Sequence, residues 1–246
     1  MNGAIVTIDV GNTNVKGIVW REARVASRFG FATAALTDGL AAPHLPADTS
    51  RIAIASVVPS ANEPLRDALE RDLSGVPLHL LSARDPLPIQ IAYRTPHTLG
   101  ADRIAAALGA HARYPDAPAL VVVDAGTAVT YEVLVGNRYL GGAIAAGPTL
   151  QLRSLARDTA QLPTVDLTDT PALIGTDTAS SLASGAWWGF VASVDGMLAR
   201  LRAHLNVPVT VVLTGGWSEK LSDHVTHHTL APDLVHDGLL RTSKDF

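Results

Sequence analysis

The first third of the chain alternates apolar runs with short polar turns. Three segments, Ala4–Ile8, Val15–Trp20 and Arg24–Phe31, are rich in apolar and β-branched residues and are separated by a few polar or glycine residues each. Short segments of this composition, bounded by turn residues, are typical of β-strands joined by hairpins. The pattern therefore predicts an antiparallel meander of three strands at the N-terminus.

Beyond the meander, strand patterns alternate with helical ones. Thr33–Ser50 is expected to be a loop with a short helix at most, and Ala83–Thr98, which contains Tyr93, a second loop. Ser60, with Glu63 three residues later, has the spacing of a helix-capping box. The elements predicted here are a strand at Arg51–Val58, a helix from Ser60 to Leu73, a strand at Pro77–Leu81 and a helix from Gly100 to before Pro115.

The pattern then restarts. Ile8-Asp9-Val10-Gly11-Asn12 matches Val123-Asp124-Ala125-Gly126-Thr127, each at the end of an apolar strand and before another strand, about half the chain apart. Asp-x-Gly is common in hairpins, so chance is the alternative, but the same order of strand, hairpin, strand and helix favours an internal duplication. The elements predicted in this half are strands at Ala119–Val123, Val129–Val135, Arg138–Ala145 and Val207–Leu213, with a type I′ turn at Gly136-Asn137, helices at Pro148–Arg157, Thr178–Leu205, from Ser218 and over Asp233–Leu240, and a loop at Gln161–Gly175.

Composition narrows the classes of protein. Residues are 47% hydrophobic and 17% charged, which indicates a folded chain with a large core. A net charge of −4 and a pI near 6.1 argue against sequence-independent binding of nucleic acid. The absence of cysteine excludes disulfides and cysteine-ligated zinc. No apolar stretch is long enough to span a membrane and no signal peptide is visible, so a cytoplasmic protein is expected.

The first candidate site is the turn Asp9-Val10-Gly11-Asn12-Thr13-Asn14-Val15-Lys16. Backbone N–H groups and a lysine at a hairpin tip suit phosphate, and the carboxylate is placed to hold a metal ion. An ordinary hairpin is the alternative, because Asn and Gly are favoured turn residues. Duplication predicts that this turn and the one at Asp124 face each other across a cleft that suits a nucleoside triphosphate. Thr214-Gly215-Gly216 adds a third glycine turn, where backbone can approach a base or ribose.

These motifs resemble those of the actin-like ATPase superfamily, also called the ASKHA or ribonuclease H-like ATPases. Within it, Gly100-Ala101-Asp102-Arg103 and Gly141-Gly142-Ala143-Ile144 are similar to the type III pantothenate kinases, over essentially the whole chain. The resemblance implies an α/β fold of two domains, 1–117 and 118–246, each with a mixed five-stranded sheet and flanking helices. It also implies ATP-dependent phosphorylation of pantothenate to 4′-phosphopantothenate, the first step of coenzyme A biosynthesis.

The resemblance assigns the substrate site. Asp102 matches the family's proton acceptor, although an Asp in the first turn of a helix also complements the helix dipole. Arg103 matches a pantothenate-binding position and suits the substrate carboxylate, which it can bond with two N–H groups. Tyr93, Gly100 and Ala101 would complete that wall. Thr178 matches a later substrate-contacting threonine, with a helix N-cap as its alternative role and Thr176 or Asp177 as alternative residues.

The resemblance also assigns the nucleotide and metal sites. Every residue from Asp9 to Lys16 matches the first phosphate motif, with Asp9 on the Mg²⁺ side, and Thr127 matches a nucleotide contact. Asp124 matches a site for an activating monovalent cation, K⁺ or NH₄⁺. The family commonly has proline before the last glycine of its Gly-Gly-x-Ile-x-Pro-Gly loop, whereas here Ala146 precedes Gly147 and proline follows as Pro148. A homodimer is implied, with the helix after Thr178 as its expected contact.

Two other functions stay open at this point. The fold is shared by kinases of small sugars and acyl acids, and the same resemblance extends to Bvg accessory factors, which carry a regulatory name. The joint presence of Asp9, Lys16, Asp102, Arg103 and Asp124 favours a working kinase, because a non-catalytic protein has no chemical need for all five.

Overall fold

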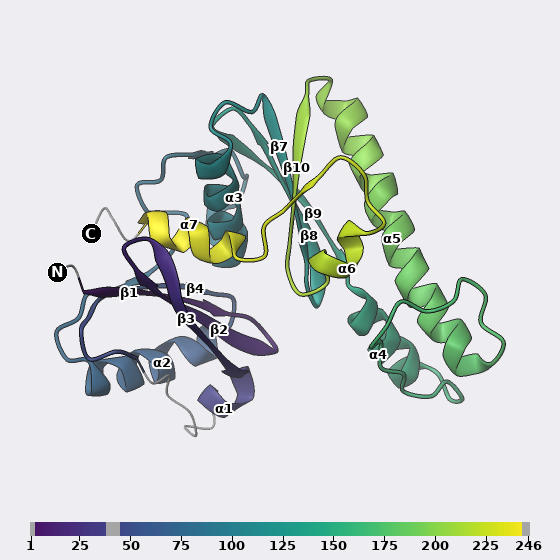
Figure 1. Cartoon of the computed structure of the whole chain (residues 1–246), viewed down its shortest axis with the longest axis horizontal. Coiled ribbons are helices and arrows are strands. Elements are labelled where there is room, and N and C mark those ends of the chain that lie inside the picture. Colours follow the sequence, from purple (N-terminus) through teal and green to yellow (C-terminus); the bar gives the residue numbers. More distant parts are fainter. Residues whose placement is uncertain (1–2, 38–44, 243–246) are drawn as a thin grey trace. The chain divides into compact units, whose positions relative to one another are not determined.

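A computed structural model of the chain describes residues 3–37 and 45–242. The chain divides into two compact units (Figure 1). The first comprises residues 1–115, 137–139 and 233–246, and the second comprises residues 116–136 and 140–232. The C-terminal helix thus belongs to the first unit by its contacts, whereas the division into 1–117 and 118–246 stays a prediction. None of the described helices is long and apolar enough to cross a membrane.

The first unit contains a five-stranded mixed sheet with the order β3-β2-β1-β4-β5. The predicted meander is confirmed, since β1 to β3 are antiparallel neighbours, while β4 and β5 are parallel to β1. The β2–β3 hairpin turns through Glu22 and Ala23, whose φ angles of 51° and 61° are those of a type I′ turn. The strands are β1 (Ala4–Val10), β2 (Asn14–Arg21), β3 (Arg24–Ala32), β4 (Thr49–Ser56) and β5 (Leu78–Leu80).

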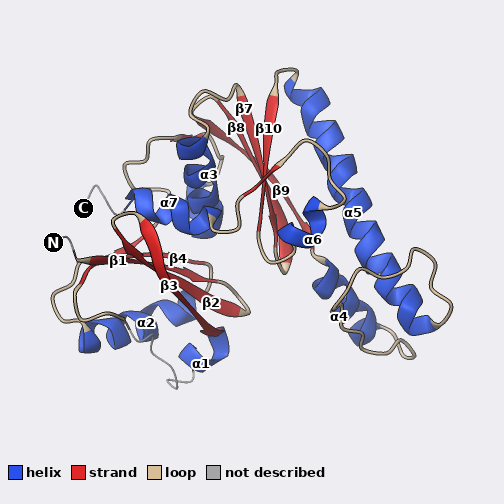
Figure 2. Cartoon of the chain, in the orientation of Figure 1, coloured by secondary structure: helices blue, strands red, loops and turns tan. Residues whose placement is uncertain are grey.

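Helices cover both faces of this sheet (Figure 2). On one face, Leu65 and Leu69 of α2 pack with Val6 and Ile8 of β1. The helix begins at Pro59 and not at Ser60, so the capping-box prediction was wrong; proline suits the first helical position because its φ is already helical. The other elements of this half are α1 (Thr33–Thr37), α2 (Pro59–Asp72), β6 (Gln90–Ile91), the 3₁₀ helix η1 (Pro96–Thr98), α3 (Ala101–Arg113) and, at the C-terminus, α7 (Leu234–Thr242).

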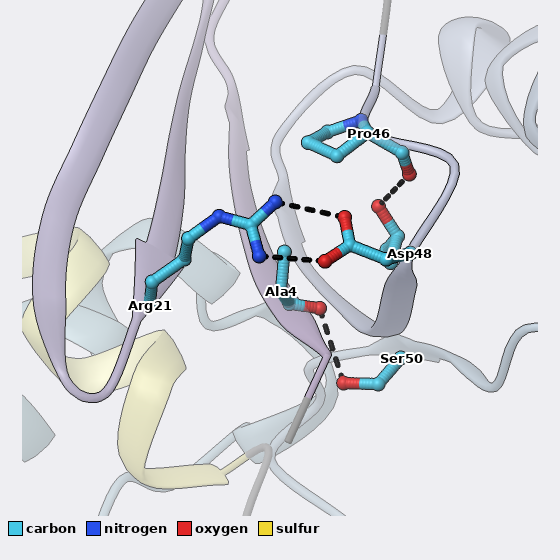
Figure 3. Close-up of polar contacts among 6 residues, drawn as sticks. Ala4, Arg21, Pro46, Asp48 and Ser50 are labelled. Carbon is cyan, nitrogen blue, oxygen red and sulfur yellow. Dashed lines mark hydrogen bonds and ion pairs between the residues drawn. The ribbon is translucent and has the colours of Figure 1, made fainter. Parts of the chain in front are cut away.

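An exposed ion pair joins the end of β2 to the segment before β4 (Figure 3). Arg21 donates two hydrogen bonds to the Asp48 carboxylate, at 2.6 and 2.8 Å. Close by, the Ser50 hydroxyl donates to the carbonyl of Ala4 at 3.1 Å. About half of each charged side chain remains exposed, so solvent screens the pair and it contributes little to stability.

The second unit repeats the strand order of the first. Its sheet runs β11-β10-β7-β8-β9-β6, which is the order β5-β4-β1-β2-β3 with one strand added. The added strand, β6, belongs to the first unit by its contacts, as do Arg138 and Tyr139 of β9, with which it pairs. This sheet therefore has six strands where five were predicted. The strands are β7 (Ala119–Ala125), β8 (Ala128–Val135), β9 (Arg138–Ala146), β10 (Val209–Thr214) and β11 (Thr229–Leu230). The shared topology confirms the internal duplication.

The turn between β8 and β9 differs from its prediction. Gly136 has a φ of +55°, but Asn137 does not share a positive φ, so the predicted type I′ turn at this pair was wrong. Glycine at the first central position alone supplies the one left-handed residue that this turn uses. The type I′ hairpin of the chain is instead the β2–β3 turn described above.

The long helix α5 (Thr178–Leu205) has the bounds that its apolar period predicted. Trp187, Phe190 and Val194 pack against the face of the sheet that carries Val121 and Val123. The helix contains glycines, but a Cβ added at Gly185 or Gly189 would meet nothing within 4 Å, so these two do not serve close helix packing within the chain. The remaining helices of this unit are α4 (Pro148–Asp158) and α6 (Ser218–Ser222), and the predicted loop over Gln161–Gly175 is confirmed.

Candidate active site

The first phosphate-type turn joins two strands whose ends are fixed in the core. Val10 and Val15 are fully buried, whereas Asn12, Thr13 and Asn14 between them are exposed. The turn is closed by a hydrogen bond of 3.0 Å from the Gly11 N–H to the Asn14 carbonyl. A rigid base with exposed amide and hydroxyl groups at its tip is suited to bind an anion without reorganisation.

The charged groups of this turn lie side by side. Asp9 and Lys16 are partners in the register of β1 and β2, so their side chains project from the same face of the sheet. Lys16 is exposed and Asp9 is partly buried. The pair can therefore present a cation to phosphate oxygens and a carboxylate to a metal ion that those oxygens also hold.

The candidate base lies at the start of α3. Asp102 is in the first helical turn, and its Oδ1 accepts a 2.7 Å hydrogen bond from the Arg103 backbone N–H. A Cβ added at Gly100 would lie 2.5 Å from Asp102 Oδ1 and 3.4 Å from Val57 Cγ1. The carboxylate therefore folds back over residue 100, where glycine leaves the room it needs. Burial raises the pKa of the Asp102 carboxyl, although the Arg103 N–H and its positive charge oppose the rise.

Arg103 is held beside the ring of Tyr93. Its side chain is buried, with 7% of the residue exposed, and its guanidinium carbon lies 5.9 Å from the centroid of the Tyr93 ring. Tyr93 in turn contacts Tyr139 of β9, with 6.3 Å between the ring centroids. A guanidinium held over an aromatic face is oriented for planar recognition of a carboxylate. Sequence reasoning missed Tyr139, which is brought to Tyr93 by the pairing of β6 with β9.

The second phosphate-type turn, in the second unit, is closely framed by backbone. A Cβ added at Gly215, whose φ is +90°, would lie 2.3 Å from Asp124 Oδ1. The Trp217 N–H donates to the carbonyl of Ala125 at 2.9 Å. The predicted adenosine turn, Thr214-Gly215-Gly216, thus lies directly against the Asp124 carboxylate, and Thr127 remains exposed at the tip.

The altered glycine loop continues a strand into a helix, and Gly141 within it has a φ of +123°. β9 continues through Gly141 and Gly142 to Ala146, Gly147 forms the N-cap of α4 and Pro148 is its first residue. Proline at this position starts the helix without losing a needed N–H donor. The departure from the family pattern therefore shifts proline from the loop into the helix start.

Thr178 lies at a pocket but does not cap its helix. The N-cap of α5 is Asp177, whose carboxylate accepts from the Ser180 N–H at 2.8 Å, so the capping role goes to this alternative. Thr178 is left facing an open pocket of about 560 Å³. The pocket is also lined by Leu162, Gly175, Thr176, Asp177, Ser181 and Leu182.

The structure thus brings the predicted residues together in groups within each unit. Asp9 and Lys16 share one hairpin; Tyr93, Gly100, Asp102 and Arg103 surround the start of α3, all in the first unit. Asp124, Thr127 and Thr178 belong to the second. Among the described residues, no group of three or more His, Cys, Asp or Glu is arranged to hold a metal ion. A single carboxylate with substrate phosphates and water is the usual way a kinase holds Mg²⁺, and Asp9 fits that pattern.

Comparison with known proteins gives the family. A sequence model of the type III pantothenate kinases matches residues 5–200. A type III pantothenate kinase of Nitratidesulfovibrio vulgaris strain DP4 is 39% identical over 96% of this chain and 95% of its own length. Two solved structures share the fold at low identity: a Baf family transcriptional activator from Campylobacter jejuni (TM-score 0.64, 19% identity, 98% of each chain) and a ROK family glucokinase from Streptomyces griseus (TM-score 0.57, 15% identity, 99% and 100%). The chain therefore belongs to the type III pantothenate kinase family and is a kinase.

Proposed function

We propose that this kinase transfers the γ-phosphoryl group of ATP to the primary hydroxyl of pantothenate, with Asp102 as the general base. The observation that carries the proposal is the start of α3, where a partly buried carboxylate and a buried guanidinium are adjacent in a chain of this family. One group suits the hydroxyl of the substrate and the other its carboxylate. The product is 4′-phosphopantothenate, the first intermediate on the way to coenzyme A.

The bond-making step uses Asp102. The proton of the substrate hydroxyl passes to a carboxylate oxygen of Asp102, the hydroxyl oxygen bonds to the γ-phosphorus, and the bond to the bridging oxygen breaks to release ADP. Burial raises the pKa of Asp102, which makes its ionised form a stronger base than an exposed carboxylate would be. Its hydrogen bond to the Arg103 N–H leaves the second oxygen available to the substrate.

Binding groups surround this step. Arg103, oriented over Tyr93, takes the pantothenate carboxylate, and Gly100 and Ala101 form the adjacent wall. Lys16 and the turn from Asp9 to Asn14 bind the ATP phosphates, where Lys16 offsets charge that grows on the leaving group. When bound, Mg²⁺ neutralises phosphate charge, and Asp9 is the residue that would hold it.

The second unit contributes further proposed contacts. Asp124 is assigned to the monovalent cation, K⁺ or NH₄⁺, Thr127 to the nucleotide and Thr178 to the substrate. Thr178 is supported by the pocket that it lines. A homodimer in the cytoplasm is also proposed, with α5 as a contact, because Gly185 and Gly189 leave open space on an exposed part of that helix. Light scattering that returns the monomer mass of 25.7 kDa would contradict the dimer.

Replacing one oxygen of the base tests the assignment. Asp102→Asn should cut turnover by about 10²–10⁴-fold, the usual contribution of a general base, and leave the dissociation constant for ATP nearly unchanged. ADP release with pantothenate and ATP binding by calorimetry are the measurements. Asp67→Asn, on the exposed side of α2, is the matched control. Turnover within a factor of about three of the unaltered protein would sink the base assignment.

The choice of substrate is tested by ADP release with pantothenate and, separately, with glucose and other small sugars, since sugar kinases share the fold. We expect a response to pantothenate alone. Release with a sugar alone would move the protein to another kinase class, and no release with any acceptor would favour the regulatory alternative.

A further inference from the structure

The C-terminal helix α7 packs against the helix that carries Asp102 and the strand that carries Asp9, although more than a hundred residues separate it from both in the sequence. Within the first unit it crosses and packs against α3, which carries Asp102, and it packs against β1, which carries Asp9 (Figure 1). The contact of α7 with α3 and its contact with β1 are of different kinds, and each restricts the position of α7.

The contact with α3 is backbone against backbone. A Cβ added at Gly238 of α7 would lie 1.9 Å from the Ala105 carbonyl oxygen, and one at Gly109 of α3 would lie 2.3 Å from the Leu234 carbonyl oxygen. Asp102, Ala105 and Gly109 are three and four residues apart, so they lie on one face of α3. No flexible side chain separates the helices at this crossing, and any displacement of α7 is therefore passed directly to the helix that carries the base.

The contact with the sheet is a buried polar junction. Thr7 is fully buried, and its hydroxyl accepts a 2.8 Å hydrogen bond from the Trp20 indole N–H and shares a 2.9 Å hydrogen bond with Nδ1 of His236 in α7. Arg28 of β3 adds an ion pair of 2.5 Å to Asp233, the residue before the helix. Leu240 completes the contact by packing with Trp20.

These sheet residues lie on the same strand faces as the phosphate-binding pair. Side chains alternate along a strand, so Thr7 and Asp9 project from one face of β1, and Trp20 and Lys16 project from the same face of β2. The polar junction is thus two residues along the strand from Asp9 and four from Lys16.

We propose that α7 is a brace that sets the position of the general base Asp102 relative to the phosphate-binding pair Asp9 and Lys16, with Thr7, His236 and Gly238 as positioning residues. The proposal rests on the function proposed above. Transfer requires the substrate hydroxyl at Asp102 to meet the γ-phosphorus at about 3–3.5 Å and in line. ATP is assigned to Asp9 and Lys16, and pantothenate to the start of α3. Loosening α7 should therefore slow the transfer step and leave the binding of each substrate intact.

Two substitutions loosen the brace at its two ends. Thr7→Val keeps the shape of the side chain and removes both hydrogen bonds, whereas Thr7→Ser keeps the hydroxyl. Gly238→Ala forces α7 away from α3, whereas Arg241→Ala changes an exposed residue of the same helix. The measurement is kcat per ATP-binding site, below the melting temperature, with the dissociation constants of ATP and pantothenate determined in parallel.

We expect kcat to fall about tenfold or more in Thr7→Val and Gly238→Ala, with both dissociation constants within about threefold and with near-normal values in Thr7→Ser and Arg241→Ala. A purely structural role would reduce the number of ATP-binding sites without changing kcat per site, and that result would overturn the proposal.

Hydrogen exchange separates this proposal from the proposed function. In both loosened variants, amides of residues 101–106 and of residues 9–16 should exchange faster, whatever the substrate of the enzyme. Faster exchange confined to α7 would overturn the brace. Absence of pantothenate-dependent ADP release by the unaltered protein would instead remove the proposed function, and the exchange result would still decide whether α7 couples the two regions.

Discussion

The two Asp-x-Gly turns of this kinase have similar backbone hydrogen bonds but different side chains beside the aspartate. In each, a buried strand ends, and the glycine N–H donates to a carbonyl across the turn at 3.0 Å, from Gly11 to Asn14 in the first and from Gly126 to Ala128 in the second. The bond spans three residues in the first turn and two in the second, so both copies keep the closing bond of the glycine N–H while the second turn is one residue shorter.

A second shared bond extends the likeness to the next element. The carbonyl of Thr13 accepts from the Thr33 N–H at 3.0 Å, and that of Thr127 accepts from the Gly147 N–H at 2.9 Å. Thr33 starts α1 after the third strand of the first unit, and Gly147 precedes α4 after the third strand of the second. Both turns are thus held by the helix that follows their meander.

The side chains differ where charge matters. Lys16 is the register partner of Asp9, whereas Thr130, a neutral residue, is the register partner of Asp124. A carboxylate beside a lysine suits a phosphate with its metal ion, and we expect a carboxylate whose cross-strand partner is neutral to suit a monovalent cation. The two copies thus share a framework and differ in the residue across from each carboxylate, a lysine in the first turn and a threonine in the second.

Removing the cation of the first turn should break the comparison most strongly. Lys16→Ala leaves phosphate charge without its partner, and we expect kcat/KM for ATP to fall about 10²–10³-fold. Steady-state ADP release measures it. Arg24→Ala removes an equally exposed cation from β3 and should have little effect. A loss below about fivefold for Lys16→Ala would mean that the first turn does not use its lysine for phosphate.

The second turn should be the more sensitive to added bulk. A Cβ at Gly147 would lie 2.3 Å from the Gly126 carbonyl oxygen and 2.8 Å from that of Thr127, and backbone atoms cannot move aside cheaply. Gly147→Ala should lower the free energy of unfolding by about 2–3 kcal/mol, as overpacking typically does. The matching position of the first turn already accommodates Thr33. Urea unfolding gives the values, and a change below about 0.5 kcal/mol would contradict the close framing of this turn.

Local pattern was enough to predict much of this architecture. The Asp-Gly turns, the meanders around them and the bounds of α5 follow from alternation, turn residues and a helical apolar period, which are properties of neighbouring residues. The duplication of one fold pattern also followed, because it needed only the recognition that one sequence pattern occurs twice, whereas the strand order itself came from the structure. Of the site, the position of Asp102 at a helix start was predictable in the same way.

Contacts between distant residues could not be predicted. Thr7 and His236 are 229 residues apart, and nothing near either one signals the bond between them. The addition of β6 beside β9, which brings Tyr139 to Tyr93, likewise depends on a pairing of two residues only. The requirement for glycine at 147 appears only when the turn that it packs against is in place.

Low pH should destabilise the Thr7–His236 junction near the first turn through protonation of His236. Val122 stands at the position before Asp124 that Thr7 occupies before Asp9, so the second turn has no such junction. Burial lowers the pKa of His236 from 6.5 to about 4. Between pH 6.5 and pH 4, His236 is protonated in the unfolded chain but stays neutral in the folded chain. The contribution of His236 to the free energy of unfolding is therefore complete above pH 6.5 and declines as the pH falls towards 4.

The expected loss from pH 8 to pH 5 that is due to His236 is about 2 kcal/mol. His236→Asn keeps a polar atom near the Nδ1 position and does not titrate, so its stability should depend less on pH by that amount. His204→Asn, on an exposed position of α5, is the matched control. Urea unfolding at the two pH values measures the difference, and equal pH dependence in His236→Asn and the unaltered protein would remove His236 as the cause.

The two aspartates themselves give the finest test of the comparison. If each turn serves a different cation, the unaltered enzyme should be about tenfold faster in K⁺ or NH₄⁺ than in Na⁺ at constant ionic strength, and Asp124→Asn should abolish that ratio. Asp9→Asn should keep the ratio and instead raise the Mg²⁺ concentration needed for half-maximal rate. ADP release under the two titrations measures both effects.

Equal rates of the unaltered enzyme in Na⁺ would argue against a monovalent site at Asp124, and loss of the K⁺ ratio in Asp9→Asn would mean that the copies still share one function. Because the glycine N–H closes both turns, separate effects of the two variants would connect each role to the surroundings of its carboxylate, the lysine beside Asp9 and the glycine backbone against Asp124.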